Sequence, residues 1–266
     1  MRSKFTQKVR EVVKRIKPRS FLIYKEVAKK AGNVKAYRAV AQILKNSPKD
    51  VPCHRVIKSN NLVGGYMGRE YLDWLKSALL LKEGAVGVIP TDTIYGICTS
   101  AFNKKSVEKV YKLRKRSPNK PCIILISDLN DLKKFEVKLK NWQRKILEKI
   151  WPGKVSVILA CYSKKFYYLH RGTNSLAFRL PKNKLILNIL KISGPLIAPS
   201  ANWEGEEPAK NIKEAKKYFS NKVFYLDRGN LVSKPSTLID LREKKIKILR
   251  EGEGIKKVFE ILRHFQ

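Results

Sequence analysis

The spacing of apolar residues changes near residue 84, and this change constrains the fold more than any other feature of the sequence. Before it, apolar residues recur at the spacing that predicts amphipathic helices. After it, short β-favouring runs alternate with helical ones, which predicts an α/β domain with a twisted mixed sheet. We therefore expect two domains, residues 1–83 and 84–266, rigidly coupled through a shared helix over residues 69–82.

The individual elements follow from the same patterns. Before residue 84 we expect helices at residues 5–16, 23–31, 34–46 and 69–82. After it we expect strands at residues 85–89, 123–126, 155–160, 176–180, 196–199, 223–226, 237–239 and 246–249. Helices are expected between some of these strands, at residues 106–115, 142–150, 185–191, 212–219 and 255–265.

The charge of the chain favours an anionic partner. Its 58 Lys and Arg against 22 Asp and Glu leave a net charge of +36, which indicates nucleic acid or nucleotides, although a solvated lysine-rich surface gives the same count. No apolar run is long enough to span a membrane and the first residues lack a secretion signal, so we expect a cytoplasmic protein without membrane contact. The four cysteines are too widely spaced to indicate a zinc site or a disulfide framework.

Two of the expected helices form a helix-turn-helix pattern. Residues 23–31 and 34–46 are separated by Gly32 and Asn33, as in the motif that places its second helix against DNA. That second helix carries hydrogen-bond donors suited to phosphates and base edges, namely Lys35, Arg38, Gln42 and Lys45. Any two helices joined by a glycine turn give this pattern, so it is a hypothesis only.

A reactive thiol is indicated by the run Pro-Cys-His-Arg-Val at residues 52–56. Cys53 stands beside His54 and Arg55, and such neighbours lower the pKa of a thiol and make it nucleophilic. A buried, inert cysteine is the alternative. In its surroundings the run resembles the DNA-binding, active-site domain of the alkylguanine-DNA alkyltransferases (methylated-DNA-cysteine methyltransferases) and alkyltransferase-like proteins. The matching residues are Tyr24, Glu26-Val27-Ala28, Arg38-Ala39-Val40, Asn46, Pro48, Pro52 to Val56, Gly64-Gly65-Tyr66 and Leu80 to Gly84.

This resemblance implies a winged helix-turn-helix-like domain over about residues 5–84. It implies that Cys53 accepts an alkyl group, that His54 activates it through water, and that Glu83 orients the histidine. The alkylated base has to leave the duplex before it can react.

Three further residues are implied to bind the nucleic acid. By the resemblance Arg38 fills the gap left by the flipped base, Tyr24 crowds the phosphate of the extruded nucleotide, and Asn46 holds the loop before the cysteine. Ser20 and Lys25 stand where the family usually has glycine, and the spacing from Asn46 to Cys53 is one residue short. The alternative is therefore a module that only grips nucleic acid, with Cys53 unused.

Three motifs after residue 84 indicate a ligand site. The run Pro-Thr-Asp-Thr-Ile-Tyr-Gly at residues 90–96 ends an expected strand, a basic run follows at residues 114–121, and Pro-Ser-Ala-Asn at residues 199–202 follows another strand. Such corners commonly hold ligands, and clustered cations suit phosphate. Each motif taken alone fits an ordinary turn or a solvated charge run equally well.

Together these motifs resemble the YrdC-type threonylcarbamoyl-AMP synthase domain over residues 83–266. The likeness includes four further elements in the family's order, namely Trp151 to Lys154, Phe178 to Pro181, Pro235 to Thr237 and Ile248 to Gly252. The resemblance implies that L-threonine and bicarbonate form a carbamate that attacks ATP, releasing pyrophosphate and threonylcarbamoyl-AMP for threonylcarbamoyladenosine formation in tRNA by the downstream transferase machinery. Mg²⁺ is expected on the triphosphate, with no protein-bound metal site.

The resemblance also assigns the site residues. The threonine and bicarbonate end is implied to be lined by Thr91, Thr93, Tyr95 and Arg179. Phosphates and carbamate are implied to meet Arg114, Arg116 and Lys120, where arginine at 114 replaces the family's lysine. Ser200 and Asn202 are implied to contact the nucleotide, and Ser236 and Arg250 to close its phosphate and adenosine side. Ser156 is expected among the substrate- and ATP-binding residues, where serine replaces the family's threonine. The chain ends soon after Arg250, so we expect no further C-terminal domain of the kind that longer synthases carry.

The sequence thus predicts an L-threonylcarbamoyladenylate synthase with an N-terminal nucleic-acid-binding module. Two alternatives stay open. One is a bifunctional protein that also repairs alkylated guanine in DNA through Cys53, and the other is a protein that binds RNA or DNA and has an inactive synthase pocket. Because phosphate contacts carry no sequence information, the pattern does not separate tRNA from DNA as the ligand of the module.

Overall fold

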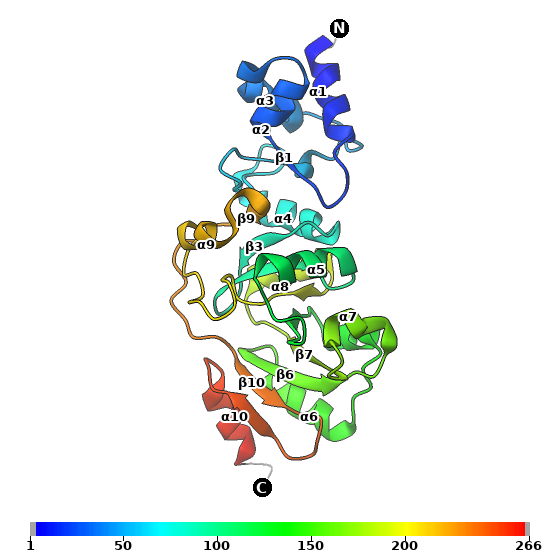
Figure 1. Ribbon diagram of the computed structural model, residues 1–266, viewed down its shortest axis with the longest axis vertical. Helices are drawn as coiled ribbons and strands as arrows, with labels where there is room; N and C mark the ends of the chain where they lie inside the picture. Colours follow the sequence, from blue (N-terminus) through cyan, green and yellow to red (C-terminus); the bar gives the residue numbers. More distant parts are fainter. Residues whose placement is uncertain (1–3, 264–266) are drawn as a thin grey trace.

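The computed structural model describes residues 4–263, with the N-terminal helices at one end of an elongated molecule and α10 at the other (Figure 1). Its α-helices are α1 (Lys4–Lys14), α2 (Tyr24–Lys30), α3 (Tyr37–Lys45), α4 (Asp73–Lys82), α5 (Lys104–Leu113), α6 (Asn141–Ile150), α7 (Tyr167–His170), α8 (Lys184–Ser193), α9 (Ile212–Phe219) and α10 (Ile255–Leu262). The helices expected from the sequence are confirmed, with ends that differ by a few residues, and residues 264–265 of the last expected helix lie outside the described residues.

The strands form two sheets. They are β1 (Leu22–Ile23), β2 (Val56–Ile57), β3 (Gly87–Pro90), β4 (Tyr95–Ser100), β5 (Ile123–Leu125), β6 (Val155–Ala160), β7 (Ser175–Arg179), β8 (Leu196–Ile197), β9 (Phe224–Tyr225), β10 (Thr237–Asp240) and β11 (Lys247–Arg250). β1 and β2 pair in parallel as a small separate sheet. The other nine strands lie in the order β11-β10-β6-β7-β5-β8-β4-β3-β9, with parallel and antiparallel neighbours. The expected mixed sheet is confirmed.

The N-terminal helices pack around a small core of their own. Val9 and Val13 of α1 meet Val27 of α2 and Val40 of α3 there, all buried. The turn between α2 and α3 passes through Gly32, whose φ of +97° is a backbone conformation that glycine adopts without steric cost. The helix-turn-helix arrangement expected from the sequence is therefore present.

Helices cover both faces of the large sheet, because successive side chains of a strand point to opposite faces. Ile89 of β3 and Leu125 of β5 belong to the core that contains α4 and α8. Their chain neighbours Val88 and Ile124 belong to the larger core on the other face. That larger core is completed by residues of α5, α6, α9 and α10.

Residues before 84 take part in the packing of the large sheet. α4 packs along α8, and its Leu80 and Leu81 are fully buried in the core that this pair shares with the sheet. The chain also extends the sheet edge, since Val63 N donates to Tyr225 O and Tyr225 N donates to Asn61 O, both at 2.9 Å. The division of the chain at residues 83 and 84 stays a prediction, but the expected shared helix is observed.

The sequence did not predict β4. All six of its residues are buried, so the strand lacks the alternation of polar and apolar residues that marks a half-exposed strand. With β3 it forms a hairpin, and the expected corner at residues 90–96 is the end of that hairpin. Within residues 4–263 no helix is long and apolar enough to cross a lipid bilayer.

Candidate functional site

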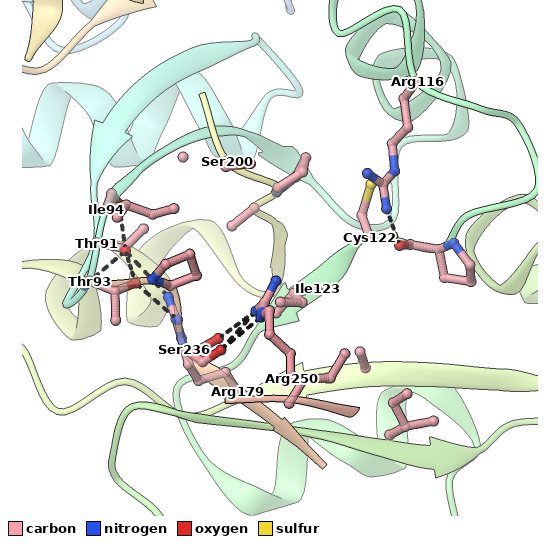
Figure 2. A pocket seen from close by; sticks show the side chains of 18 of the residues that line it. Thr91, Thr93, Ile94, Arg116, Cys122, Ile123, Arg179, Ser200, Ser236 and Arg250 are labelled. Atoms are coloured by element: carbon pink, nitrogen blue, oxygen red, sulfur yellow. Dashed lines mark hydrogen bonds between the residues drawn. The ribbon is translucent and has the colours of Figure 1, made fainter. Parts of the chain in front are cut away.

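A cavity of about 470 Å³ opens at the end of the β3–β4 hairpin, beside the ends of several other strands of the large sheet. Nine of the residues expected to bind substrate line it: Thr91, Thr93, Tyr95, Arg114, Arg116, Arg179, Ser200, Ser236 and Arg250. They come from segments far apart in the chain, and the sheet brings them together. Figure 2 shows Arg179 directed at Thr91 and Thr93, and Arg250 hydrogen-bonded to Ser236 in a neighbouring part of the site.

One wall of the cavity is built around Arg179, the last residue of β7. Its Nη1 donates to Thr93 Oγ1 at 3.2 Å and its Nη2 donates to Thr91 Oγ1 at 3.3 Å (Figure 2). The Asp92 carboxylate lies 3.1 Å from Nη2 and supplies the counter-charge. Burial lowers the pKa of Arg179, and the charge of Asp92 opposes that effect. The two threonine hydroxyls are therefore held in fixed positions by a buried cation.

A second cation, Arg114, is fixed by the segment after β8. Its Nη2 donates to Ser200 Oγ and to Asn202 Oδ1, each at 3.1 Å, and its Nε donates to the Asn202 carbonyl. Burial lowers the pKa of Arg114 to about 10, which leaves it charged at neutral pH. Its Nη1 is buried and has no hydrogen-bond partner among the described residues. Asn202 does not line the cavity but orients the arginine that does.

Arg116 lies at the opposite side, where it fixes the loop before β5. Its Nε donates to the Lys120 carbonyl at 3.0 Å and its Nη2 to the Pro121 carbonyl at 2.7 Å. Lys120 itself does not line the cavity, since its ammonium pairs with Glu204 at 2.9 Å and is exposed. Of the expected phosphate clamp, the structure therefore brings Arg114 and Arg116 to the cavity and leaves Lys120 at its edge.

The last wall is formed by Ser236 and Arg250. Arg250 Nη2 donates to the Ser236 carbonyl at 2.8 Å, and the Ser236 hydroxyl is 2.8 Å from that of Ser156. Ser156 is fully buried behind Ser236 and does not line the cavity. Burial lowers the pKa of Arg250, and the positive charge of Arg179 lowers it further. The arginines of the site are thus close enough to affect each other's protonation.

Sequence reasoning missed Arg242, which also lines the cavity. It follows β10, and its Nη2 donates to Asp240 Oδ2 at 2.6 Å. The only signal in the sequence is an arginine two residues after a strand-end aspartate, which is too common to predict a site. With it five arginines line the cavity, and Asp92 and Asp240, which pair with two of them, do not line it. That excess of positive charge suits a polyanion such as a triphosphate.

The polar groups of the cavity differ from those of a metal centre. Within residues 4–263 no group of three or more His, Cys, Asp or Glu side chains is arranged to hold a metal ion.

A second cavity, of about 310 Å³, lies in the N-terminal part and contains Cys53. Tyr24 lines it, as do Gln42 and Lys45 of α3. The Cys53 thiol donates to the Leu44 carbonyl at 3.5 Å. Burial raises the pKa of this thiol, so the expectation that its neighbours in the chain lower it was wrong.

The side chains of His54 and Arg55 bind Glu83 rather than the thiol. His54 Nε2 is 2.9 Å from Glu83 Oε1, and Arg55 donates to both oxygens of the same carboxylate. Burial favours the neutral form of Glu83, but the hydrogen bonds from His54 and Arg55 outweigh it and lower the pKa of Glu83 to about 2. The expected pairing of His54 with Glu83 is present in the geometry, and Arg55 is an additional partner that the sequence did not reveal.

Lys76 of α4 was also missed, and it is the most unusual residue of the second cavity. Its side chain is 1% exposed and its Nζ donates to the Gly65 carbonyl at 3.4 Å. Burial lowers the pKa of Lys76 to about 7, although the neighbouring Cys53 and Glu70 oppose the change. A lysine amine with a pKa of about 7 therefore lines the same cavity as the Cys53 thiol.

The two other residues expected to bind nucleic acid lie on the surface. Arg38 is exposed on α3, with its guanidinium 5.9 Å from the centre of the Tyr37 ring. Asn46 is exposed at the end of α3, and its carbonyl accepts a hydrogen bond from Arg10 at 3.4 Å. Both stay predictions.

A mixed sheet that gathers buried arginines and threonine hydroxyls at its strand ends defines an α/β protein that binds a small anionic ligand. Residues 79–252 match the family model Sua5_yciO_yrdC, described as telomere recombination, and the chain belongs to this Sua5/YciO/YrdC family. Residues 4–85 match a second model, described as the DNA-binding domain of 6-O-methylguanine DNA methyltransferase. The resemblance to both families that the motifs indicated is confirmed.

Curated relatives carry a common name. A protein of Methanocaldococcus jannaschii, provisionally named threonylcarbamoyl-AMP synthase, is 33% identical over 186 residues, which is 69% of this chain and 86% of that protein. The threonylcarbamoyl-AMP synthase of Bacillus subtilis is 32% identical over 133 residues, which is 49% of this chain and 38% of that enzyme. The match thus spans most of the first relative and less than half of the second.

Solved structures agree with the fold. The structure of Pyrococcus abyssi Sua5 complexed with L-threonine has a TM-score of 0.65 and 26% identity, covering 71% of this chain and 58% of that one. Escherichia coli YciO has a TM-score of 0.63 and 23% identity, covering 71% of this chain and 94% of that one, and supports the fold alone.

Proposed function

We propose that this protein is an L-threonylcarbamoyladenylate synthase, a nucleotidyltransferase that makes threonylcarbamoyl-AMP and pyrophosphate from L-threonine, bicarbonate and ATP. The observation that carries the proposal is the cavity with five arginines and two fixed threonine hydroxyls. The names of the relatives and the threonine complex of P. abyssi Sua5 support the same activity.

In this proposal the residues of the cavity divide into an end for the amino acid and its carbamate and an end for the nucleotide. Thr91, Thr93 and Arg179 present hydroxyls beside a cation, which suits the carboxylate and hydroxyl of a small amino acid and the carbamate formed on its amine. Arg114 and Arg250, with Ser200 and Ser236 beside them, suit the phosphates and the nucleoside. The unpartnered Nη1 of Arg114 is a donor that a phosphate oxygen would satisfy.

The proposed chemistry needs positioning and charge stabilisation rather than a protein nucleophile. The threonine amine and bicarbonate give a carbamate and water, and a carbamate oxygen then attacks the α-phosphorus of ATP. The new P–O bond forms as the bond to the β-phosphate breaks, and pyrophosphate carries away the electron pair. Fixed arginines lower the barrier by stabilising the charge on the phosphates during transfer. Magnesium, held mainly by phosphate oxygens, would neutralise part of that charge.

We further propose the surroundings in which the product is used. A carbamoyl adenylate is a reactive mixed anhydride, so it requires an acceptor close by, and the proposed acceptor system is the tRNA threonylcarbamoyl transferase machinery of the cytoplasm. The N-terminal module, with α3 carrying the exposed Arg38, would supply affinity for tRNA or DNA.

The test of the synthase proposal is release of pyrophosphate from ATP and bicarbonate, with formation of the carbamoyl adenylate followed by mass spectrometry. Pyrophosphate release that depends on L-threonine is expected, and Arg114→Ala should reduce it at least a hundredfold. Lys213→Ala removes an exposed lysine of α9 and is the charge-matched control. Absence of threonine-dependent release from the unmodified protein contradicts the proposal.

A second candidate activity is alkyl transfer to Cys53, and one observation favours it. The thiol lies in the second cavity, and its chain neighbour His54 is hydrogen-bonded to Glu83. In this proposal His54 removes the thiol proton through a water and Glu83 holds the imidazole in place. The raised pKa of Cys53 makes this activation necessary, since the free thiolate is scarce at neutral pH.

Mass spectrometry of Cys53 tests this second candidate. After incubation with benzylguanine or with duplex DNA that contains O6-methylguanine, a mass increase on Cys53 is expected, and it should be lost in His54→Ala. If Cys53 stays unmodified while the protein still binds the DNA, the module only grips nucleic acid.

A further inference from the structure

An ion pair connects α4 to the segment that follows β9. Asp73, the first residue of α4, accepts hydrogen bonds from Arg228 Nη1 at 2.8 Å and from Nη2 at 2.7 Å. Both oxygens of the carboxylate and both terminal nitrogens of the guanidinium are used, which is the arrangement that best fixes the direction of an arginine. The two residues are 155 positions apart in the chain, so the contact links its two halves.

The same turn holds a residue of the substrate cavity. The backbone N–H of Arg228 donates to Tyr95 Oη at 2.9 Å, and Tyr95 Oη donates to the Gly229 carbonyl at 2.9 Å. Asp227 closes the turn, because its side chain accepts from the Gly229 N–H at 2.9 Å. The Tyr95 hydroxyl is therefore engaged with the turn at residues 227–229, and the tyrosine ring forms part of the cavity wall.

The segment that leaves this turn builds another part of the wall. Residues 229–236 contain no helix or strand, and they end at Pro235 and Ser236, which line the cavity. Their far end is fixed by Arg250 and Ser156, which bind Ser236. Their near end is fixed by the turn that Asp73 and Tyr95 hold. The middle of the segment is held by other contacts, since Leu231 N donates to the Lys210 carbonyl at 2.8 Å and Lys234 N donates to Glu253 Oε1 at 3.0 Å. The part directly after the turn therefore depends most on the turn for its position.

We propose that Asp73 is a positioning residue of the synthase site, acting through Arg228 on Tyr95 and on the segment 229–236. The family match begins at residue 79, so Asp73 lies outside the matched region. In this proposal a residue from the N-terminal part of the chain helps to position residues of the synthase site. The inference concerns the substrate site assigned under the proposed function and rests on that assignment.

The ion pair is suited to this role because it is only partly open to water. The side chain of Asp73 is 18% exposed and that of Arg228 is 36% exposed. The hydrogen bonds that Arg228 donates to Asp73 raise the pKa of Arg228, so the guanidinium stays charged over the whole range in which the enzyme can be assayed. Substitution of Asp73 or Arg228 should therefore act by moving the turn at residues 227–229, and not by a change in the protonation of Arg228.

Kinetics of variants at both ends of the pair test the proposal. Asp73→Asn and Arg228→Gln should each raise KM for L-threonine roughly threefold to tenfold while kcat falls less than twofold, because the chemical groups of the site stay in place but are less ordered. Arg228→Gln leaves the first turn of α4 unchanged, so agreement between the two variants excludes an effect on helix stability. Equal KM values for both variants and the unmodified protein overturn the proposal.

A double-mutant cycle separates this role from general stabilisation. Tyr95→Phe keeps the ring in the wall but cannot hydrogen-bond to the turn. If Asp73 acts in part through Tyr95, the double variant Asp73→Asn with Tyr95→Phe should raise KM by less than the product of the two single effects. Multiplication of the two effects contradicts the proposed path. Glu243→Gln removes a similar pair, with Lys247 at 2.9 Å, on an exposed part of the chain and is the control expected to change nothing.

Hydrogen exchange makes the inference testable apart from the catalytic assignment. The amides of residues 227–230 should exchange several times faster in Asp73→Asn than in the unmodified protein, while those of α9 should not change. Unchanged exchange over residues 227–230 overturns the inference even in an active enzyme. Faster exchange in a protein that releases no threonine-dependent pyrophosphate supports the anchoring and contradicts the proposed function instead.

Discussion

At the scale of single residues, the substrate cavity depends on arginines that are buried and already partly hydrogen-bonded. Arg179 donates two hydrogen bonds to threonine hydroxyls and pairs with Asp92, so the orientation of its guanidinium is fixed before a ligand binds. A buried cation needs such a counter-charge, because its transfer from water is costly. The positive charge of the site is therefore already in position when the ligand binds.

Replacement of Arg179 by lysine should therefore be severe, although the charge is kept. A lysine cannot bind both threonine hydroxyls and face Asp92 at once, because it lacks the planar fork of the guanidinium. We expect kcat/KM for L-threonine to fall by roughly a hundredfold or more in the pyrophosphate assay. Arg144→Lys, on an exposed position of α6, is the matched control. A loss below threefold at Arg179 contradicts this role.

Lys76 leads to a prediction about stability, because burial disfavours the charged form of its amine. Its pKa is about 7 in the folded protein and 10.5 ordinarily, so between these values the unfolded chain binds a proton that the folded chain lacks. The free energy of unfolding should then rise with pH over this window, by up to about 1.4 kcal/mol per pH unit, and level off below pH 7.

Urea unfolding of Lys76→Met at pH 7 and pH 9 measures this effect. The variant lacks the titrating amine, so the unmodified protein should gain on the order of 2 kcal/mol relative to it between the two pH values. Lys82→Met, at an exposed position of the same helix, should follow the pH dependence of the unmodified protein. Parallel pH dependence in Lys76→Met and the unmodified protein argues against a neutral amine.

At the scale of elements, patterns predicted the helices and most strands, and burial explains what they did not predict. The sequence of α9 predicted both of its ends, since its apolar residues face one core and its polar residues face water. β4 was missed because both of its faces are covered. Lys76 was missed because a lysine in a helix is normally exposed to solvent, whereas this one is buried at the wall of the second cavity.

The candidate site shows the same division. Motifs predicted the residues that line the cavity when they stand at strand ends, as Arg179 and Ser200 do. They did not separate a residue that lines the cavity from one that supports it, so Ser156 and Asn202 were assigned direct contact. Nor did they predict Asp73, because its contact with Arg228 depends on how two distant segments pack.

The approach of β11 to the segment before β10 leads to a prediction at this scale. Gly252 lies so close to the carbonyls of Pro235 and Ser236 that an added Cβ would overlap with the Pro235 oxygen. Gly252→Ala should displace Ser236 from Arg250 and Ser156, and so raise KM for ATP about tenfold or more. Gly194→Ala, at a glycine with open space around it, should cost stability but leave KM for ATP unchanged. Equal KM values for both variants would show that the close approach is not needed.

At the scale of the whole molecule, the segment between the two matched regions belongs to both. Leu80 and Leu81 of α4 lie in the core that contains α8, while Glu83, directly after α4, binds His54 and Arg55 of the N-terminal part. Residues 61–63 pair with Tyr225 at the edge of the large sheet. Displacement of either part therefore disturbs contacts of the other, and the coupling that the sequence predicted has a structural basis.

Truncation tests where the synthase part begins. A fragment of residues 84–266 lacks α4 and the edge contacts of residues 61–63, which exposes buried residues of α8 such as Ile189 and Leu190. Loss of that much apolar contact exceeds the margin by which domains are stable, so this fragment should aggregate or bind a hydrophobic dye. A fragment of residues 56–266 keeps α4, the sheet edge and Asp73, and should melt cooperatively and release pyrophosphate with threonine. If residues 84–266 alone fold and retain full activity, the expected boundary at residue 84 is correct and neither α4 nor Asp73 is needed by the synthase site.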